Sequence, residues 1–295
     1  MDIRPPAAGG IGARVTGLDV RNLDSGDAAA LKAAVYEHKL VVLSEQRPSA
    51  EEYIAFARQL GRVQVYFQDN YHHPEHPEIF VSSNVPENGK KVGVAGTGQY
   101  WHTDYQFALE PLSTTLVYPQ ILPDSRRETY YIDMARVYRE LPPHLRRALD
   151  GRRAVAEGKW RYKVAPKDID RALVDLLGEI ERLVPPVSHP AVIQHPVTGQ
   201  HSLYLSSGFS TGLEGLSHED NQRLLAELFA FIEREEHVHT HVWSHGDILY
   251  WDNRTLLHRA GVTPPGERSK SYRIGVYDEH PFYTNGEARP AMAIR

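Results

Sequence analysis

The sequence contains no cysteine among its 295 residues. This absence excludes disulfide bridges, thiolate nucleophiles, zinc fingers and cysteine-ligated iron–sulfur clusters. A metal ion bound by side chains would need histidine and carboxylate ligands, and the sequence supplies 16 histidines and 38 acidic residues. Any metal site is therefore expected to be of the nitrogen–oxygen kind.

Long apolar runs are also missing. No stretch reaches the roughly 18 apolar residues of a membrane-spanning helix, and the first residues lack an apolar core of signal-peptide length. The formal net charge of −5 does not favour binding to nucleic acid or to an anionic membrane. We therefore expect a cytoplasmic protein with neither of these partners.

Local patterns predict many short strands and a few helices. Strands are expected at 13–20, 39–44, 79–83, 113–118, 128–132, 160–164, 201–205, 237–243, 248–251 and 271–277. Helices are clearest at 28–38 with Asp27 as N-cap, at 50–60 between Ser49 and Gly61, and at 221–236. Because the order shows no βαβ rhythm and no long linker, we predict one domain, 1–295, mainly β with flanking helices.

The most informative stretch is the aromatic run from Tyr100 to Phe107, which contains His102 and Asp104. In an extended strand, residues i and i+2 point to the same face, so this imidazole and this carboxylate could coordinate one metal ion together. His258 lies far downstream and would add a second imidazole. Two histidines and one carboxylate form the facial triad of non-haem Fe(II) oxygenases. The glycine-rich segment 87–98 leads into this stretch and is a candidate lid.

Other histidines compete with this interpretation. His218 and His245 each have an aspartate two residues later, but one pair precedes a predicted helix and the other fits a turn between strands. The alternating histidines 237, 239 and 241 could bind zinc from one strand face, as three histidines do in some enzymes. No general base is evident near them, so we favour an exposed strand face.

Three motifs together resemble the taurine dioxygenase (TauD/TfdA) family of Fe(II)/2-oxoglutarate oxygenases. They are W-H-x-D at 101–104, G-D-x-x-x-W-D-N-R-x-x-x-H at 246–258, and Arg273 fifteen residues later. The resemblance implies a double-stranded β-helix (jelly-roll) core and Fe(II) bound by His102, Asp104 and His258. It also implies that Thr129 and Arg273 bind the distal carboxylate of the cosubstrate 2-oxoglutarate, a role that suits the planar arginine fork.

A finer resemblance, to the isonitrile-forming branch of the family, rests on the histidine-rich segment 71–83, on Arg127-x-Thr129-Tyr130 and on Lys163. In that branch the equivalents of Arg127 and Lys163 hold substrate carboxylates, and we add Tyr66 and Tyr105 as candidate substrate-binding residues. The sequence departs from the branch at two places: Phe67 replaces a tyrosine, and Val262 replaces a histidine.

The resemblance implies oxidation of a small carboxylate-bearing substrate by dioxygen. The favoured reaction is oxidative decarboxylation of an N-carboxymethyl β-amino acid, or its fatty-acyl derivative, to an isonitrile. Plain C–H hydroxylation of a small acid is the alternative within the same chemistry. A metal-binding jelly roll without turnover, acting as a sensor, is the alternative from another class. A homo-oligomer is possible.

Overall fold

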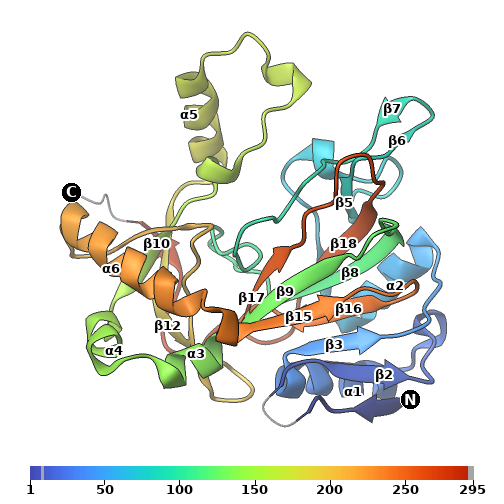
Figure 1. Cartoon of the computed structure of the whole chain (residues 1–295), viewed down its shortest axis with the longest axis horizontal. Helices are drawn as coiled ribbons and strands as arrows, with labels where there is room; N and C mark the ends of the chain where they lie inside the picture. The colour runs from blue at the N-terminus through green and yellow to red at the C-terminus, as the bar shows by residue number, and fades with distance from the viewer. Residues whose placement is uncertain (8–9, 292–295) are drawn as a thin grey trace.

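The computed structural model describes residues 1–7 and 10–291. Its largest element is an eight-stranded sheet that is antiparallel except for the pairing of β2 with β3 (Figure 1). The strand order is β1 (Asp2–Arg4), β2 (Ala13–Thr16), β3 (Leu40–Leu43), β16 (Ile248–Asp252), β8 (Thr114–Ile121), β18 (Lys270–Tyr277) and β4 (Arg62–Gln64), with β5 (Phe80–Ser83) also paired to β18.

A three-stranded antiparallel sheet lies against this large sheet. It contains β15 (Val238–Val242), β9 (Glu128–Asp133) and β17 (Leu256–Ala260), in that order. Buried side chains of both sheets share one apolar cluster, in which Tyr131 and Leu256 of the small sheet meet Leu40 and Trp251 of the large one. Burial of such groups supplies the main favourable energy that joins the two sheets.

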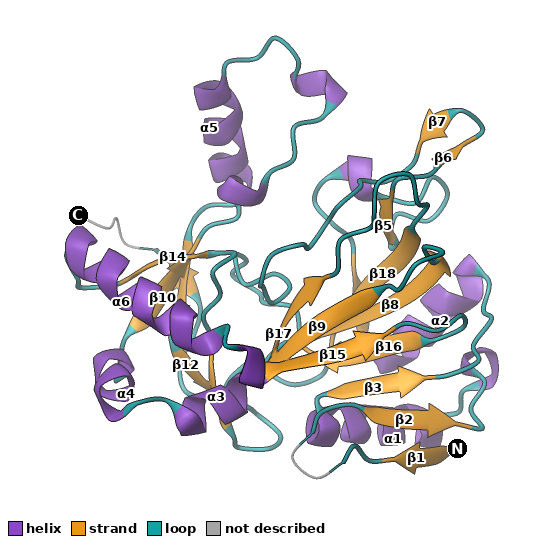
Figure 2. Cartoon of the chain, in the orientation of Figure 1, coloured by secondary structure: helices purple, strands orange, loops and turns teal. Residues whose placement is uncertain are grey.

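Two helices cover the opposite face of the large sheet. These helices, α1 (Ser25–His38) and α2 (Ala50–Leu60), bury Leu31 and Phe56 in the main core together with Val41 and Ile274 of the sheet. Figure 2 shows both helices behind β2, β3 and β16. The site described below therefore lies on a sheet that is supported from behind.

The rest of the chain packs beside the two sheets. It includes a sheet of β14 (Ser210–Leu213), β10 (Arg153–Ala156), β11 (Val187–Pro190) and β19 (Arg289–Pro290), and the hairpin of β12 (Val192–Gln194) and β13 (His201–Leu203). The helices of this part are α3 (Met134–Glu140), α4 (Pro143–Leu149) and α6 (His218–Ile232). Its apolar cluster extends to Trp101 and Leu257, next to two of the predicted metal ligands.

Two segments project from this body in Figure 1: α5 (Leu173–Leu183) and the hairpin of β6 (Pro86–Glu87) and β7 (Lys90–Lys91). The hairpin occupies part of the candidate lid 87–98, whose mobility stays a prediction. The fold is thus a mixed α/β arrangement with several antiparallel sheets, and helices are more prominent than the mainly-β prediction implied. Within the described residues, no helix is both long and apolar enough to cross a membrane.

Several local predictions differ from the structure. The first helix begins at Ser25, because Asp24 rather than Asp27 accepts the capping hydrogen bond, from the Asp27 amide. The strand predicted at 160–164 is wrong: Lys159–Arg161 forms a 3-10 turn, since Lys159 pairs with Glu157 and Glu181 outside any sheet. His102 is not part of a strand either, and makes only an isolated bridge with His258.

The predicted start of α2 is confirmed. The Ser49 hydroxyl accepts a hydrogen bond from the Glu52 amide at 3.2 Å, and the Glu52 carboxylate accepts one from the Ser49 amide at 2.7 Å. We expect Ser49→Ala to lower the free energy of unfolding by about 1 kcal/mol, the usual effect of losing such a cap. Urea denaturation would measure the change. A loss below about 0.3 kcal/mol would show that water replaces the cap at no cost.

Candidate metal centre

Backbone pairing brings the two predicted histidine ligands together. The His102 amide donates to the His258 carbonyl at 3.1 Å, and the His258 amide donates to the His102 carbonyl at 2.8 Å. His258 lies on β17 of the small sheet, whereas His102 lies in the segment between β7 and β8. The reciprocal pair sets the imidazole centroids 4.1 Å apart.

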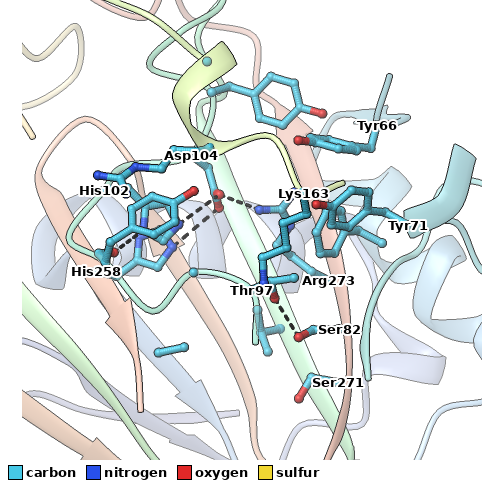
Figure 3. A pocket seen from close by; sticks show the side chains of 18 of the residues that line it. Tyr66, Tyr71, Ser82, Thr97, His102, Asp104, Lys163, His258, Ser271 and Arg273 are labelled. Carbon is cyan, nitrogen blue, oxygen red and sulfur yellow. Dashed lines mark hydrogen bonds and ion pairs between the residues drawn. The ribbon is translucent and has the colours of Figure 1, made fainter. Parts of the chain in front are cut away.

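The carboxylate of Asp104 completes the cluster, as Figure 3 shows. Its Oδ1 lies 3.9 Å from His102 Nε2, and its Oδ2 lies 3.8 Å from His258 Nε2. One donor atom from each of the three residues falls within 4.8 Å of the others, and all three side chains are buried. Among the described residues, no other histidine or acidic cluster meets this criterion. Residues 1–7 and 10–291 therefore offer one geometric candidate for a metal site.

The electrostatics favour the forms that bind a metal. Burial lowers the pKa of both histidines, and for His258 the neighbouring His102 adds to the effect. Both imidazoles are thus neutral near pH 7, as metal ligation requires. Burial raises the pKa of Asp104, but the positive charge of Arg273 and the hydrogen bond from Thr115 act against it, and that pKa is lowered to about 2. Two neutral imidazoles and one carboxylate fit Fe(II).

The three ligand side chains differ in the hydrogen bonds that hold them in place. His102 Nδ1 lies 2.8 Å from the Tyr100 carbonyl and donates to it, which leaves Nε2 free for a metal. Asp104 accepts from Thr115 Oγ1 at 2.7 Å and from an Arg273 Nη1 at 2.5 Å. His258 Nδ1 has no hydrogen-bond partner among the described residues, although it is buried. The aspartate is therefore the most tightly held of the three.

A cavity opens beside the triad, and every other residue that the sequence predicted for cosubstrate or substrate binding lines it. Aromatic side chains from several elements form much of its wall. The predicted residues that line it are Tyr66, Tyr105, Arg127, Thr129, Lys163 and Arg273. Sequence reasoning assigned no site role to Ser82, Thr97, Phe209, Trp243 and Ser271, which also line it.

The predicted cosubstrate residues lie on different sheets. Thr129, on β9, accepts a hydrogen bond from Trp243 Nε1 at 2.9 Å. Arg273, on β18, packs its guanidinium 4.0 Å from the centre of the Phe80 ring. The two sheets thus contribute one residue each to the same cavity.

Two of the predicted substrate residues are cations that donate hydrogen bonds to polar groups of the protein. Arg127 donates to the hydroxyls of Thr263 and Ser269, both at 3.1 Å. Lys163 donates to the backbone carbonyls of Ala95 at 2.7 Å and Gly96 at 2.5 Å. Figure 3 shows its side chain reaching down toward Thr97.

Comparison with known proteins decides the family. The family model described as "Taurine catabolism dioxygenase TauD, TfdA family" matches residues 2–274. The chain belongs to the TauD/TfdA family. It is a 2-oxoglutarate-dependent non-haem iron dioxygenase, with His102, Asp104 and His258 as the Fe(II) site and 2-oxoglutarate as cosubstrate. The prediction of an enzyme is confirmed, and the alternative of a sensor without turnover is set aside.

Relatives in this TauD/TfdA family span nearly the whole chain. Pentalenolactone F synthase from Streptomyces arenae is 30% identical over 277 residues, covering 91% of each chain. A 2,4-dichlorophenoxyacetate dioxygenase from Cupriavidus pinatubonensis is 29% identical over 279 residues, covering 90% of this chain and 94% of the other. A crystal structure of a taurine dioxygenase from Burkholderia xenovorans has a TM-score of 0.78 at 26% identity, covering 99% and 95%.

Proposed function

We propose that this dioxygenase oxidises a small substrate bearing carboxylate groups, and that Arg127 and Lys163 hold them. The observation that carries the proposal is that these two cations have no carboxylate partner among the described residues. Neither forms an ion pair with a carboxylate within residues 1–7 and 10–291, and burial lowers the pKa of both. Both side chains are half-buried, and an unpaired charge that has lost part of its water is costly, so an arriving carboxylate would supply the missing partner.

The aromatic wall completes the proposed substrate pocket. Tyr66 and Tyr105 contact each other edge to face, with ring centres 5.9 Å apart, and Tyr105 stacks on Phe107. Tyr105 has a left-handed backbone with φ of 57°, which non-glycine residues adopt rarely and often at functional sites. We assign both tyrosines to the apolar part of the substrate.

The cosubstrate assignment is supported by the same cavity. Arg273 is a half-buried cation adjacent to the triad, and the Thr129 hydroxyl lines the cavity from the facing sheet. We propose that the two residues bind the distal carboxylate of 2-oxoglutarate, through the guanidinium fork and the hydroxyl. When iron is bound, it supplies the oxidative decarboxylation of 2-oxoglutarate by dioxygen. The protein groups orient both organic acids beside it.

Two further predictions concern the whole protein. The facing eight-stranded and three-stranded sheets, with a shared core, support a double-stranded β-helix in a single domain, 1–295. A cytoplasmic location and a possible homo-oligomer stay predictions from the sequence alone.

For the reaction, we favour oxidative decarboxylation of an N-carboxymethyl β-amino acid to an isonitrile. Two cations in one pocket suit a dianionic acid, and Arg127, Thr129 and Lys163 keep the spacing that suggested this branch. Hydroxylation of a small acid is the alternative. The relative that is an alpha-ketoglutarate-dependent 2,4-dichlorophenoxyacetate dioxygenase supports the dioxygenase chemistry that both candidates share.

The test uses the anaerobic enzyme with Fe(II) and 2-oxoglutarate, titrated with N-carboxymethyl-β-alanine while the metal absorption is recorded. We expect a perturbed spectrum and, after oxygen is admitted, a product that has lost carbon dioxide and four hydrogens. Lys163→Ala should weaken the titration about tenfold, because it removes one charged contact. Lys167→Ala, on the same segment but exposed, is the matched control.

A product heavier by one oxygen atom would favour hydroxylation over isonitrile formation. Equal binding by the Lys163→Ala variant and the wild type would reject the assigned role of this cation. If no N-carboxymethyl or simple carboxylic acid perturbs the spectrum, the carboxylate-bearing substrate class is wrong, although the dioxygenase assignment would stand.

A further inference from the structure

A chain of hydrogen bonds leads from the large sheet to the metal-binding carboxylate. Trp251 Nε1 donates to Asn253 Oδ1 at 3.0 Å, and Asn253 Nδ2 lies 2.9 Å from Thr115 Oγ1. Thr115 Oγ1 lies 2.7 Å from Asp104 Oδ2. All four side chains are at most 3% exposed. Only Asp104 among them belongs to the triad, and neither Trp251 nor Asn253 has another assigned role.

The direction of this chain follows from its first member. An indole N–H can only donate, so the Asn253 side chain must turn its oxygen toward Trp251 and its NH₂ toward Thr115. The Thr115 hydroxyl then accepts from Asn253 and has one proton left to give. Asp104 Oδ2, 2.7 Å from Thr115 Oγ1, is the acceptor that receives it.

Backbone contacts keep the chain in place. The Asn253 amide donates to the Ser113 carbonyl at 3.0 Å, and the Asn253 carbonyl accepts from Thr103 Oγ1 at 2.8 Å. Thr115 and Trp251 face each other in the pairing of β8 with β16. The segment that contains the ligand Asp104 is therefore attached to the same two strands that carry the hydrogen-bond chain.

We propose that Thr115 and Asn253 are positioning residues for the iron site. Thr115 fixes the plane of the Asp104 carboxylate before the metal arrives, and Asn253 ensures that the threonine proton points at that carboxylate. Without this bond, Asp104 could rotate toward Arg273, which already contacts its Oδ1 at 2.5 Å. Outer-shell partners of this kind typically change metal affinity by about 10- to 100-fold.

The experiment titrates the metal-free protein with Co(II), whose visible absorption reports the geometry of its ligands. We expect Thr115→Val, which keeps the shape and removes the hydroxyl, to weaken Co(II) binding about tenfold and to alter the spectrum. Thr115→Ser should restore both. Thr114→Val is the matched control, since Thr114 is equally buried on β8 but its hydroxyl donates to the Val276 carbonyl, at 3.5 Å, rather than to Asp104. It should leave Co(II) affinity within about twofold.

Wild-type affinity and spectrum in folded Thr115→Val would overturn the proposal, as would equal losses in Thr114→Val. If Thr115→Val does not fold, Asn253→Asp takes its place. Its carboxylate can only accept, so it would draw the Thr115 proton away from Asp104 and should also weaken and distort Co(II) binding. Unchanged Co(II) binding in that variant would equally refute the role of the chain.

Discussion

Asp104→Ala is expected to lower 2-oxoglutarate-dependent succinate formation by at least about 10²-fold, more than the loss of an outer-shell partner would. The substitution removes the only carboxylate of the triad and leaves two neutral imidazoles, a poor set for Fe(II). The measurement is succinate released at saturating 2-oxoglutarate and Fe(II), with circular dichroism to verify the fold.

The control for Asp104→Ala is Asp220→Ala, because His218 and Asp220 have the same spacing in the sequence. Asp220 lies in the first turn of α6, where it accepts from the Ser217 hydroxyl at 2.8 Å, and it is not part of the cluster of His102, Asp104 and His258. This variant should keep succinate formation within about twofold. Normal turnover in Asp104→Ala would remove Asp104 from the iron site.

Arg273→Ala is expected to raise the 2-oxoglutarate concentration needed for half-maximal turnover about 10- to 150-fold, as removal of hydrogen bonds to a charged group predicts. Arg273 is the cation nearest the triad, and the negative charge of Asp104 raises its pKa against the effect of burial. It therefore stays charged at every working pH. Initial rates of succinate formation against 2-oxoglutarate concentration give the result.

Arg62→Ala serves as the control for Arg273→Ala. Arg62 is exposed and stacks on the Tyr277 ring, with its guanidinium carbon 4.1 Å from the ring centre. Its loss should leave the 2-oxoglutarate dependence unchanged. An unaltered requirement in Arg273→Ala would assign the cosubstrate carboxylate to another cation of the cavity, such as Arg127.

The sequence alone predicted a structural feature correctly where the interactions that form it join residues close together in the chain. The capping box of Ser49 and Glu52 is a contact over three residues, and it was predicted correctly. The predicted turn at His245-Gly246-Asp247 is also confirmed, since Gly246 has a positive φ of 83° between β15 and β16. Such features depend on residues that are adjacent in the chain.

Long-range pairing could not be read from spacing alone. His102 and His258 are joined by a bridge between segments 156 residues apart (258 − 102), and no local pattern in the sequence predicts that bridge. The histidines of 237–241 show the converse error. His237 and His241 are buried rather than on an exposed strand face, and the three form no metal cluster in the described part of the chain.

The reciprocal backbone bridge between His102 and His258 has a consequence for metal exchange. Peptide hydrogen bonds, rather than the ion, hold the backbones of these two histidines together. We therefore expect the protein to keep a preformed site for divalent cations after a chelator has removed the metal. Ni(II), Cu(II) and Zn(II) all bind nitrogen–oxygen ligands more strongly than Fe(II) does. The identity of the ion in the purified protein will therefore follow supply during expression, and activity per molecule will follow the fraction that is ferrous.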